Sequence, residues 1–133
     1  MWLVDIGVLA RSVGAVMSVL KTLKTRRYQE PIDIDELYCV LSNRRRRMIL
    51  QYLLEHDSSQ PITRRTLVDY LVDQIPSISR SSANVSLYQT HLPTLSERRM
   101  VDISDRGLVS ITERGAIAIT LHAYIQRFLN TNI

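Results

Sequence analysis

Short, uncharged, hydrogen-bonding side chains gather on one face of the helix that we expect between about residues 81 and 98. This stretch has no acidic residue before Glu97, whereas a solvated helix face ordinarily carries mixed charges in pairs four residues apart. Hydroxyl and amide groups approach nucleobase edges and phosphate oxygens without repulsion, and a glutamine such as Gln89 matches N6 and N7 of adenine. The alternative to a base-contacting face is an ordinary surface helix that carries few charges. The residues that we predict to contact bases are Ser82, Ser86, Gln89 and Thr90.

Arginine supplies 15 of the 17 basic residues, and the net charge of +4 favours an anionic partner, nucleic acid before a membrane surface. The densest charge, Arg44–Arg47, opens a predicted helix, where cations oppose the helix dipole. The positive charge at this helix start must be compensated by phosphate, by the acidic residues at 33–36 or by an acidic partner. The alternative interpretation is that these arginines form a solvated or internally paired face. The arginines that we predict to contact DNA phosphates are Arg44, Arg45, Arg64, Arg65, Arg80 and Arg106.

The sequence lacks the residue groups that catalysis or metal binding require. Its three histidines are scattered, and its four glycines form no phosphate-binding loop. Asp33 and Asp35 fit a helix cap better than an acid–base pair. We expect His91 to be packed and hydrogen-bonded, and the single Cys39 to be a buried structural thiol in a reducing cytoplasm. We therefore expect no enzyme activity, no metal, no cofactor and no small-molecule substrate.

Two capping residues mark the helices that precede this polar face. Asn43 and Thr63 each stand directly before an amphipathic stretch, and a shorter helix should end near Leu41. A turn rich in serine and proline follows at residues 76–82. The side chains that we expect inside the two capped helices are Ile49, Leu50, Leu53, Leu54, Leu67, Tyr70 and Leu71.

The helix at residues 81–98 should bury an apolar stripe at 3-4-3 spacing. Pro93 removes one backbone hydrogen bond and should kink the helix or loosen its last turn. Alternating residues at 101–104 and 108–112, joined by Asp-Arg-Gly, predict a β-hairpin, and Thr112 or Glu113 should open the final helix. The predicted stripe consists of Val85, Tyr88, Leu92 and Leu95.

Both terminal segments carry apolar repeats typical of paired helices. The longest uncharged run near the start, residues 12–20, is shorter than the ~20 residues that a membrane span needs, so we favour dimerisation or core packing over membrane contact by residues 1–25. Met17 is an alternative natural start that would leave the residues before it of little consequence. The two predicted dimer seams are Ile6, Leu9, Val13, Val16 and Leu20, and then Ile117, Leu121, Tyr124 and Phe128.

Two stretches, LSNRRRRMILQYLL from Leu41 to Leu54 and SLYQTHLPTLSERRMV from Ser86 to Val101, resemble the signatures of a winged helix-turn-helix domain common in haloarchaeal proteins. Residues 37–112 are also similar to the metal-responsive ArsR-type repressors, although the sensory cysteines of those proteins are absent. The resemblance implies a mainly α fold with a small β-hairpin wing, and DNA binding as its commonest use. Arg99 stands where the pattern has glycine. The basic charge differs from the acidic surfaces of salt-adapted hosts, which favours a viral or plasmid origin or another archaeal lineage.

Three regions are therefore expected: a helix and basic connector at residues 1–30, a winged helix-turn-helix domain at 31–112 and a final helix at 113–133. The expected function is sequence-specific binding of double-stranded DNA by a cytoplasmic, homodimeric transcription regulator, a repressor of archaeal or archaeal-virus genes. The alternative is a winged-helix module that binds proteins and not DNA. The sequence leaves open the operator, any effector, activation or repression, and which terminal helix dimerises.

Overall fold

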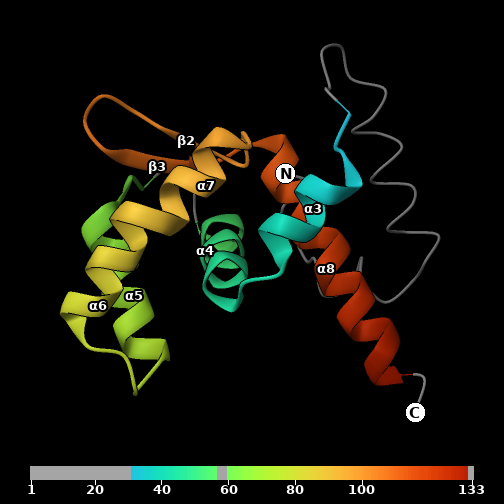
Figure 1. Ribbon diagram of the computed structural model, residues 1–133, viewed down its shortest axis with the longest axis horizontal. Coiled ribbons are helices and arrows are strands. Elements are labelled where there is room, and N and C mark those ends of the chain that lie inside the picture. Colours follow the sequence, from blue (N-terminus) through green and yellow to red (C-terminus); the bar gives the residue numbers. More distant parts are fainter. Residues whose placement is uncertain (1–30, 57–59, 132–133) are drawn as a thin grey trace.

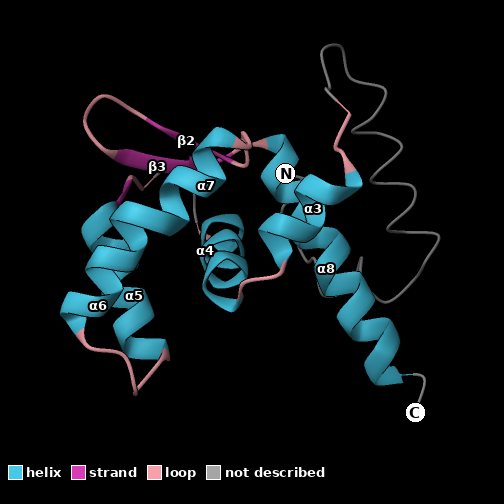
Figure 2. Cartoon of the chain, viewed as in Figure 1, coloured by secondary structure: helices cyan, strands magenta, loops and turns pink. Residues whose placement is uncertain are grey.

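The computed structural model describes residues 31–56 and 60–131, which form a helix-rich fold with a small three-stranded antiparallel sheet (Figures 1 and 2). A single π-helical turn, η1, joins two of the α-helices. The elements in chain order are α3 (Ile34–Leu41), α4 (Arg44–Glu55), β1 (Ile62–Thr63), α5 (Arg64–Gln74), α6 (Arg80–Ser86), η1 (Leu87–His91), α7 (Leu92–Glu97), β2 (Val101–Ile103), β3 (Leu108–Ile111) and α8 (Glu113–Thr131).

Helix α4 lies at the centre and packs against α3, α5, α8 and β3 (Figure 1). Its buried side chains are the predicted Ile49, Leu50, Leu53 and Leu54, each of which contributes about 1.5–3 kcal/mol by leaving water. The predicted cap is also confirmed, because the Asn43 side chain accepts hydrogen bonds from the first free backbone amides of α4. A central amphipathic helix therefore supports the elements on both sides of it.

The sheet joins the start of α5 to the hairpin of β2 and β3. The hairpin was predicted, and Gly107 adopts a φ of 79° in its turn, a conformation that glycine reaches without strain. Strand β1 was not predicted: its two residues pair with β3, Thr63 opposite Leu108 and Ile62 opposite Val109. Because Thr63 also caps α5, as predicted, this pairing places the first turn of α5 beside the hairpin turn.

The connection from α7 to β2 contains the clearest backbone strain among the described residues. Arg99 has a φ of 58°, and the amides of Arg99 and Met100 donate to the carbonyls of Ser96 and Leu95. This is a Schellman motif, which favours glycine at the Arg99 position. The glycine expected from the sequence pattern is therefore explained by the left-handed backbone.

Close contact between α8 and the end of α7 fixes the last helix. The Thr112 hydroxyl accepts from the amide of Gly115, so Thr112 caps α8, and the same hydroxyl donates to the carbonyl of Arg99. A Cβ atom at Gly115 would overlap the carbonyl oxygen of Met100, so only glycine fits there. Arg114 then donates to Glu36 at 2.9 Å and to the carbonyl of Pro31, which ties α8 to α3.

The predicted buried stripe of the long helix was wrong in its first half. Leu92 and Leu95 are buried, but Val85 and Tyr88 are 49% and 43% exposed, and Leu87 is buried instead. The reason is η1, where the amide of Leu92 donates to the carbonyl of Leu87, five residues earlier. This extra residue in one turn brings Leu87 and Leu92 to the same side of the helix.

Pro93 accounts for the position of this wide turn. The proline has no amide hydrogen, and its ring crowds the carbonyl four residues before it. The π-helical turn ends two residues before Pro93, so the disturbance is a widened turn ahead of the proline, whereas a kink or a loosened last turn was predicted. An uninterrupted α-helical period therefore gives the wrong phase for residues 80–88.

None of the helices in residues 31–56 and 60–131 is long and apolar enough to cross a lipid bilayer.

Candidate nucleic-acid interface

Helix α6 and turn η1 present a continuous polar surface to solvent. Three of the four predicted base-contacting residues, Ser82, Gln89 and Thr90, are exposed on it. Ser86 is half-buried, because its hydroxyl donates to the carbonyl of Ala83 and accepts from Arg45 at 3.1 Å. We call this surface the outer face; its exposed residues are Ser81, Ser82, Asn84, Val85, Tyr88, Gln89 and Thr90.

The local sequence explains why this face points outward. The Ser79 hydroxyl accepts from the amide of Ser82 and so starts the helix. Ala83, Leu87 and Leu92 are buried in the core and hold the opposite side. The outer face therefore contributes hydrogen-bonding groups that the fold itself does not need.

The first turn of α5 lies against this face. The guanidinium of Arg64 stands 5.0 Å from the centre of the Tyr88 ring, which is a cation–π contact. Its Nε atom is buried and finds no hydrogen-bond partner among the described residues, so the ring contact is what holds the group. Arg65, the next residue, is exposed.

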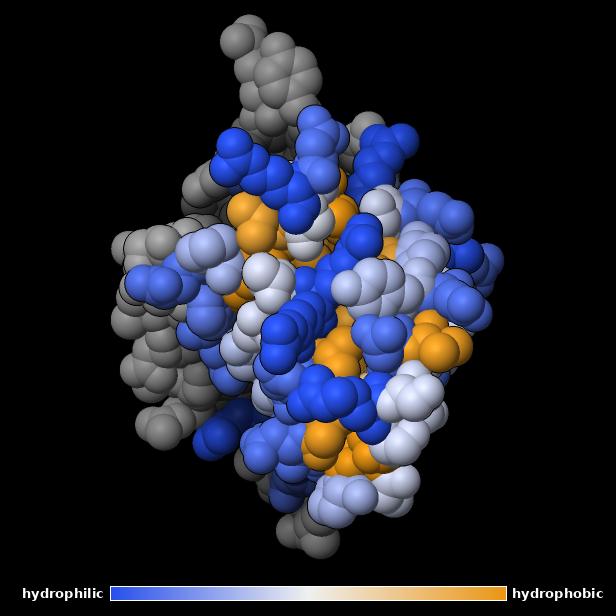
Figure 3. Space-filling view, turned by 90° about the vertical axis from the view of Figure 1, so that its left-hand side faces the viewer, coloured by the Kyte–Doolittle hydropathy of each residue, from blue (hydrophilic) through white to orange (hydrophobic). Residues whose placement is uncertain are grey.

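The hairpin turn adds a third cation beside these two. Thr63 pairs with Leu108, and Arg106 precedes Leu108 by two residues and is exposed. Figure 3 shows this side of the molecule, where hydrophilic groups surround small apolar patches. Arg64 and Arg65 therefore lie at the start of α5 beside the outer face, and Arg106 lies on the hairpin that pairs with the residues directly before α5.

Arg80 is held at the other end of α6. It forms an ion pair of 2.7 Å with Asp69 of α5, and both side chains are more than half exposed. Exposed pairs contribute little to stability, typically about 0–1 kcal/mol, and exchange partners readily. Arg80 can therefore reach an anion, but only in competition with Asp69.

The positive charge of the Arg44–Arg47 run is compensated by backbone carbonyl groups, which the sequence did not suggest. The Arg46 side chain is buried and donates to the carbonyls of Val40 at 3.1 Å and Cys39 at 2.6 Å. Arg47 donates to the carbonyl of Leu41 at 2.6 Å. These carbonyls end α3, where the helix dipole favours cations, so half of the run stabilises the preceding helix. Arg44 is exposed and remains accessible to phosphate.

His91 is buried, 4% exposed, beneath this run. Its packing was predicted and is confirmed. A hydrogen bond was also expected, and the Nδ1 atom has no partner within the described residues. Burial, followed by the nearby charges of Arg46 and Arg45, lowers the pKa of His91 from 6.5 to about 4. The imidazole is therefore neutral at pH 7.

Of the two predicted dimer seams, only the second lies within the described residues. Ile6, Leu9, Val13, Val16 and Leu20 lie outside the described residues. Ile117 is buried in its own chain, where it packs with Ile32 and the half-buried Leu121 and Tyr124. Only Phe128 of that seam is exposed, together with its neighbours Ile125 and Leu129. Dimerisation stays a prediction, and any contact through α8 must use its last two turns.

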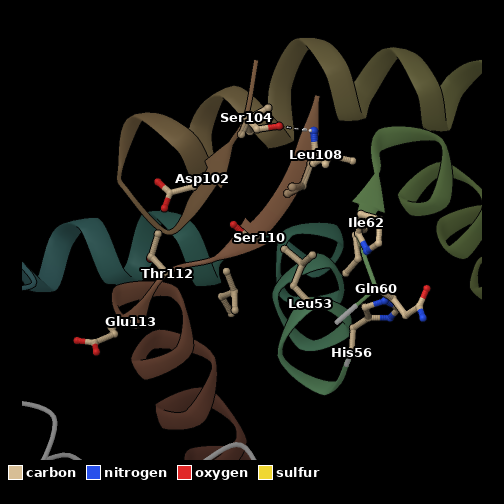
Figure 4. A pocket seen from close by; sticks show the side chains of 14 residues that line it. Leu53, His56, Gln60, Ile62, Asp102, Ser104, Leu108, Ser110, Thr112 and Glu113 are labelled. Carbon is tan, nitrogen blue, oxygen red and sulfur yellow. Dashed lines mark hydrogen bonds between the residues drawn. The ribbon is translucent and has the colours of Figure 1, made fainter. Parts of the chain in front are cut away.

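A hollow of about 700 Å³ lies away from the outer face, between the sheet and the end of α4 (Figure 4). Leu53, Ile62 and Val109 are among its apolar lining, and Asp102 and Glu113 stand near one end. None of the predicted DNA-contacting residues lines it. In the part of the chain that the structure describes, no three His, Cys, Asp or Glu residues are grouped to hold a metal ion.

Sequence reasoning missed Asn84, Val85 and Tyr88 as members of the outer face. Val85 and Tyr88 were assigned to the core because their spacing fits an α-helical period. The available signal was Leu87, a large apolar residue off that stripe, five residues before Leu92 in a segment that also contains Pro93. A π turn is what reconciles these positions.

Comparisons with known proteins give one family. Neither a search of curated proteins nor a search of solved structures found a match. A family model described as a domain of unknown function (DUF7344) matches residues 38–110, which is more than half of the 133-residue chain. The matched range begins in α3 and ends in β3, so it contains the outer face, the first turn of α5 and the hairpin. The chain therefore belongs to the DUF7344 family.

Proposed function

We propose that this protein is a sequence-specific, double-stranded DNA-binding regulator with a winged helix-turn-helix fold. Helix α5, the turn at residues 75–79 and helix α6 with η1 form the helix-turn-helix, and the hairpin of β2 and β3 is the wing. In this arrangement the second helix enters the major groove and the first lies across the phosphate backbone. The three-stranded sheet beside a helical core is compatible with this fold.

The observation that carries the proposal is the outer face with the cations beside it. It presents hydroxyl and amide groups without a carboxylate. Arg64 and Arg65 lie beside it at the start of α5, and Arg106 lies on the hairpin that pairs with β1. Uncharged groups suit base edges, whereas arginine suits phosphate. A surface meant only for water would carry mixed charges here.

We further propose that the regulator acts as a homodimer and represses archaeal or archaeal-virus genes. Two copies would place their outer faces in successive major grooves, about 34 Å apart, on an inverted repeat. The exposed Ile125, Phe128 and Leu129 at the end of α8 supply an apolar surface for a second copy. The same surface favours the second candidate function, a protein-interaction module without DNA binding.

Binding measured at two salt concentrations tests the proposal. The purified full chain is titrated into a labelled duplex from its own upstream region, at about 50 and 200 mM salt, with fluorescence polarisation as the readout. Phosphate contacts from Arg44, Arg64, Arg65 and Arg106 would weaken binding roughly 100-fold over this range for each subunit bound. Gln89→Ala should reduce the preference for the specific duplex over an unrelated one.

The second candidate predicts a different result. A module that binds only proteins would show no salt-sensitive binding to any duplex at micromolar concentration, but would still self-associate or capture a partner through α8. Ile125→Ala and Phe128→Ala should then abolish assembly, which sedimentation velocity measures.

A further inference from the structure

Val85 is an apolar side chain in the middle of the outer face. It is 49% exposed, and Ser82 and Gln89, three residues before and four after, lie on the same stripe and are exposed as well. Side chains at these spacings are neighbours on a helix surface. Val85 is therefore flanked along the helix by two uncharged hydrogen-bonding groups.

The fold does not account for this valine. The core side of the helix is made by Ala83, Leu87 and Leu92, and Val85 is not among the residues packed against the core. A β-branched residue is also less favourable in a helix than alanine. Tyr88, the other exposed apolar residue of this helix, is explained by Arg64, which covers its ring.

Residue types on the helix favour one kind of base pair over the other. Arginine and lysine are the usual partners of guanine in the major groove, and neither occurs between Ser81 and Glu97. Asn84 and Gln89, both exposed, carry the amide groups that match adenine. A thymine displays a 5-methyl group in the same groove, and apolar side chains contact that methyl favourably.

We propose that Val85 contacts thymine 5-methyl groups while Asn84 and Gln89 bond adenine, so that the outer face recognises A·T pairs in the major groove. This inference rests on the proposed DNA-binding function and names the base pairs of that same site. An apolar contact flanked by amides is complementary to an A·T pair, which shows a methyl group beside a donor and two acceptors. The cations that would hold the phosphates lie outside this stripe, on α5 and the hairpin.

The experiment uses the full chain and duplexes that the chain itself selects from a random pool about 20 base pairs long, roughly two helical turns. A selected duplex is then made twice, with thymine or with uracil at each A·T pair in turn. Uracil pairs with adenine as thymine does but lacks the 5-methyl group. Affinities of both duplexes are measured by polarisation for the wild type, Val85→Ala and the control Ile34→Ala, an exposed apolar residue on α3.

The proposal predicts selected sites with A·T pairs at their centre. At one or two positions in each half-site, uracil should weaken wild-type binding about four-fold, the value of one buried methyl group. Val85→Ala should bind the thymine duplex more weakly and lose the difference between thymine and uracil. Ile34→Ala should keep that difference. Circular dichroism melts should place all three proteins within a few degrees of one another, because both positions are exposed.

Four results would overturn the proposal. Binding to selected duplexes with no uracil effect at any position, or with the same effect in Val85→Ala, leaves DNA binding intact but removes the thymine contact. Binding to no duplex at all removes the proposed function together with this inference. A change of self-association in Val85→Ala, seen by sedimentation velocity, assigns the valine to an interface between copies.

Discussion

The first turns of α4 and α5 both carry arginines, yet the two regions use them in different directions. In α4, Arg46 and Arg47 turn back to the carbonyl oxygens that end α3. In α5, Arg64 lies over Tyr88 at the outer face and Arg65 is exposed. The denser run in the sequence therefore supplies fewer available cations than its four residues suggest.

The two sets of arginines point in different directions because different structures precede the two helices. A helix that ends directly before α4 presents carbonyl groups in need of donors, and the buried Arg46 and the half-buried Arg47 provide them. Helix α5 instead begins at a two-residue strand beside the hairpin, where no helix ends. Charge density along a sequence therefore predicts binding only after such internal acceptors are known.

Removing Arg46 should have the largest effect. Arg46→Met leaves the carbonyl of Val40 without its donor in a buried site and leaves that of Cys39 with the Ser42 hydroxyl alone, and we expect a loss of about 3 kcal/mol in the free energy of unfolding. Urea denaturation measures it. Arg44→Met, at an exposed position of the same turn, should stay within about 0.5 kcal/mol of the wild type. Equal losses in both variants would contradict an inward role for Arg46.

A fall in pH should have the second-largest effect on the free energy of unfolding, through the buried His91. The pKa of His91 is about 4 when folded and 6.5 when unfolded, so the unfolded chain takes up a proton first as the pH falls. The contribution of neutral His91 is complete above pH 6.5 and is lost between pH 6.5 and 4, by roughly 2–3 kcal/mol. Urea midpoints across this range measure it.

His91→Gln is the control for that pH dependence. Burial, followed by the charge of Arg47, also lowers the pKa of His122, so some loss in the same direction should remain in the variant. The dependence should nevertheless be clearly smaller than in the wild type. If stability depends on pH as steeply in His91→Gln as in the wild type, the pH dependence does not come from a lowered pKa of His91.

Substitution of a third arginine, Arg99, separates the effect of the backbone conformation on stability from the effect of the side chain. Arg99 occupies the left-handed position of the Schellman motif, where glycine is free of strain. Arg99→Gly should raise the free energy of unfolding by about 1 kcal/mol. Arg98→Gly, at the preceding residue with a φ of −91°, should not stabilise the protein. A loss of stability in Arg99→Gly would show that the side chain outweighs the backbone.

The smallest effect concerns the contact between Arg64 and Tyr88. On the proposed function, Tyr88→Leu should weaken duplex binding two- to five-fold, the equivalent of about 0.5–1 kcal/mol for an exposed cation–π contact. Tyr88→Phe keeps the ring and should bind as the wild type does. In Arg64→Ala, Tyr88→Leu should have no further effect. Additive losses in the double variant would mean that the two side chains act independently.

Much of the fold follows from local sequence signals. Asn43 and Thr63 cap the helices that they were predicted to cap, the buried side of α4 is as expected, and the hairpin turns at Gly107. These features depend on short-range hydrogen bonds and on one helical period, so a sequence reveals them. The DNA-contact assignments remain predictions.

The parts that could not be predicted depend on long-range contacts. Strand β1 has only two residues and exists because β3, far along the chain, pairs with it. The partner carbonyls of Arg46 become visible only when α3 and α4 are packed. The phase of the outer face depended on η1, whose extra residue no α-helical periodicity contains.

The salt dependence of DNA binding in two matched variants tests the central claim most directly. Arg65→Ala and Arg47→Ala each remove one charge from the first turn of a helix. We predict that Arg65→Ala reduces the slope of log affinity against log salt by about 0.9 for each subunit bound. Arg47→Ala should leave the slope unchanged, because the guanidinium of Arg47 donates to the carbonyl of Leu41. Equal slopes in the wild type and Arg65→Ala, or a larger change in Arg47→Ala, would contradict the assignment of the α5 start to the DNA backbone.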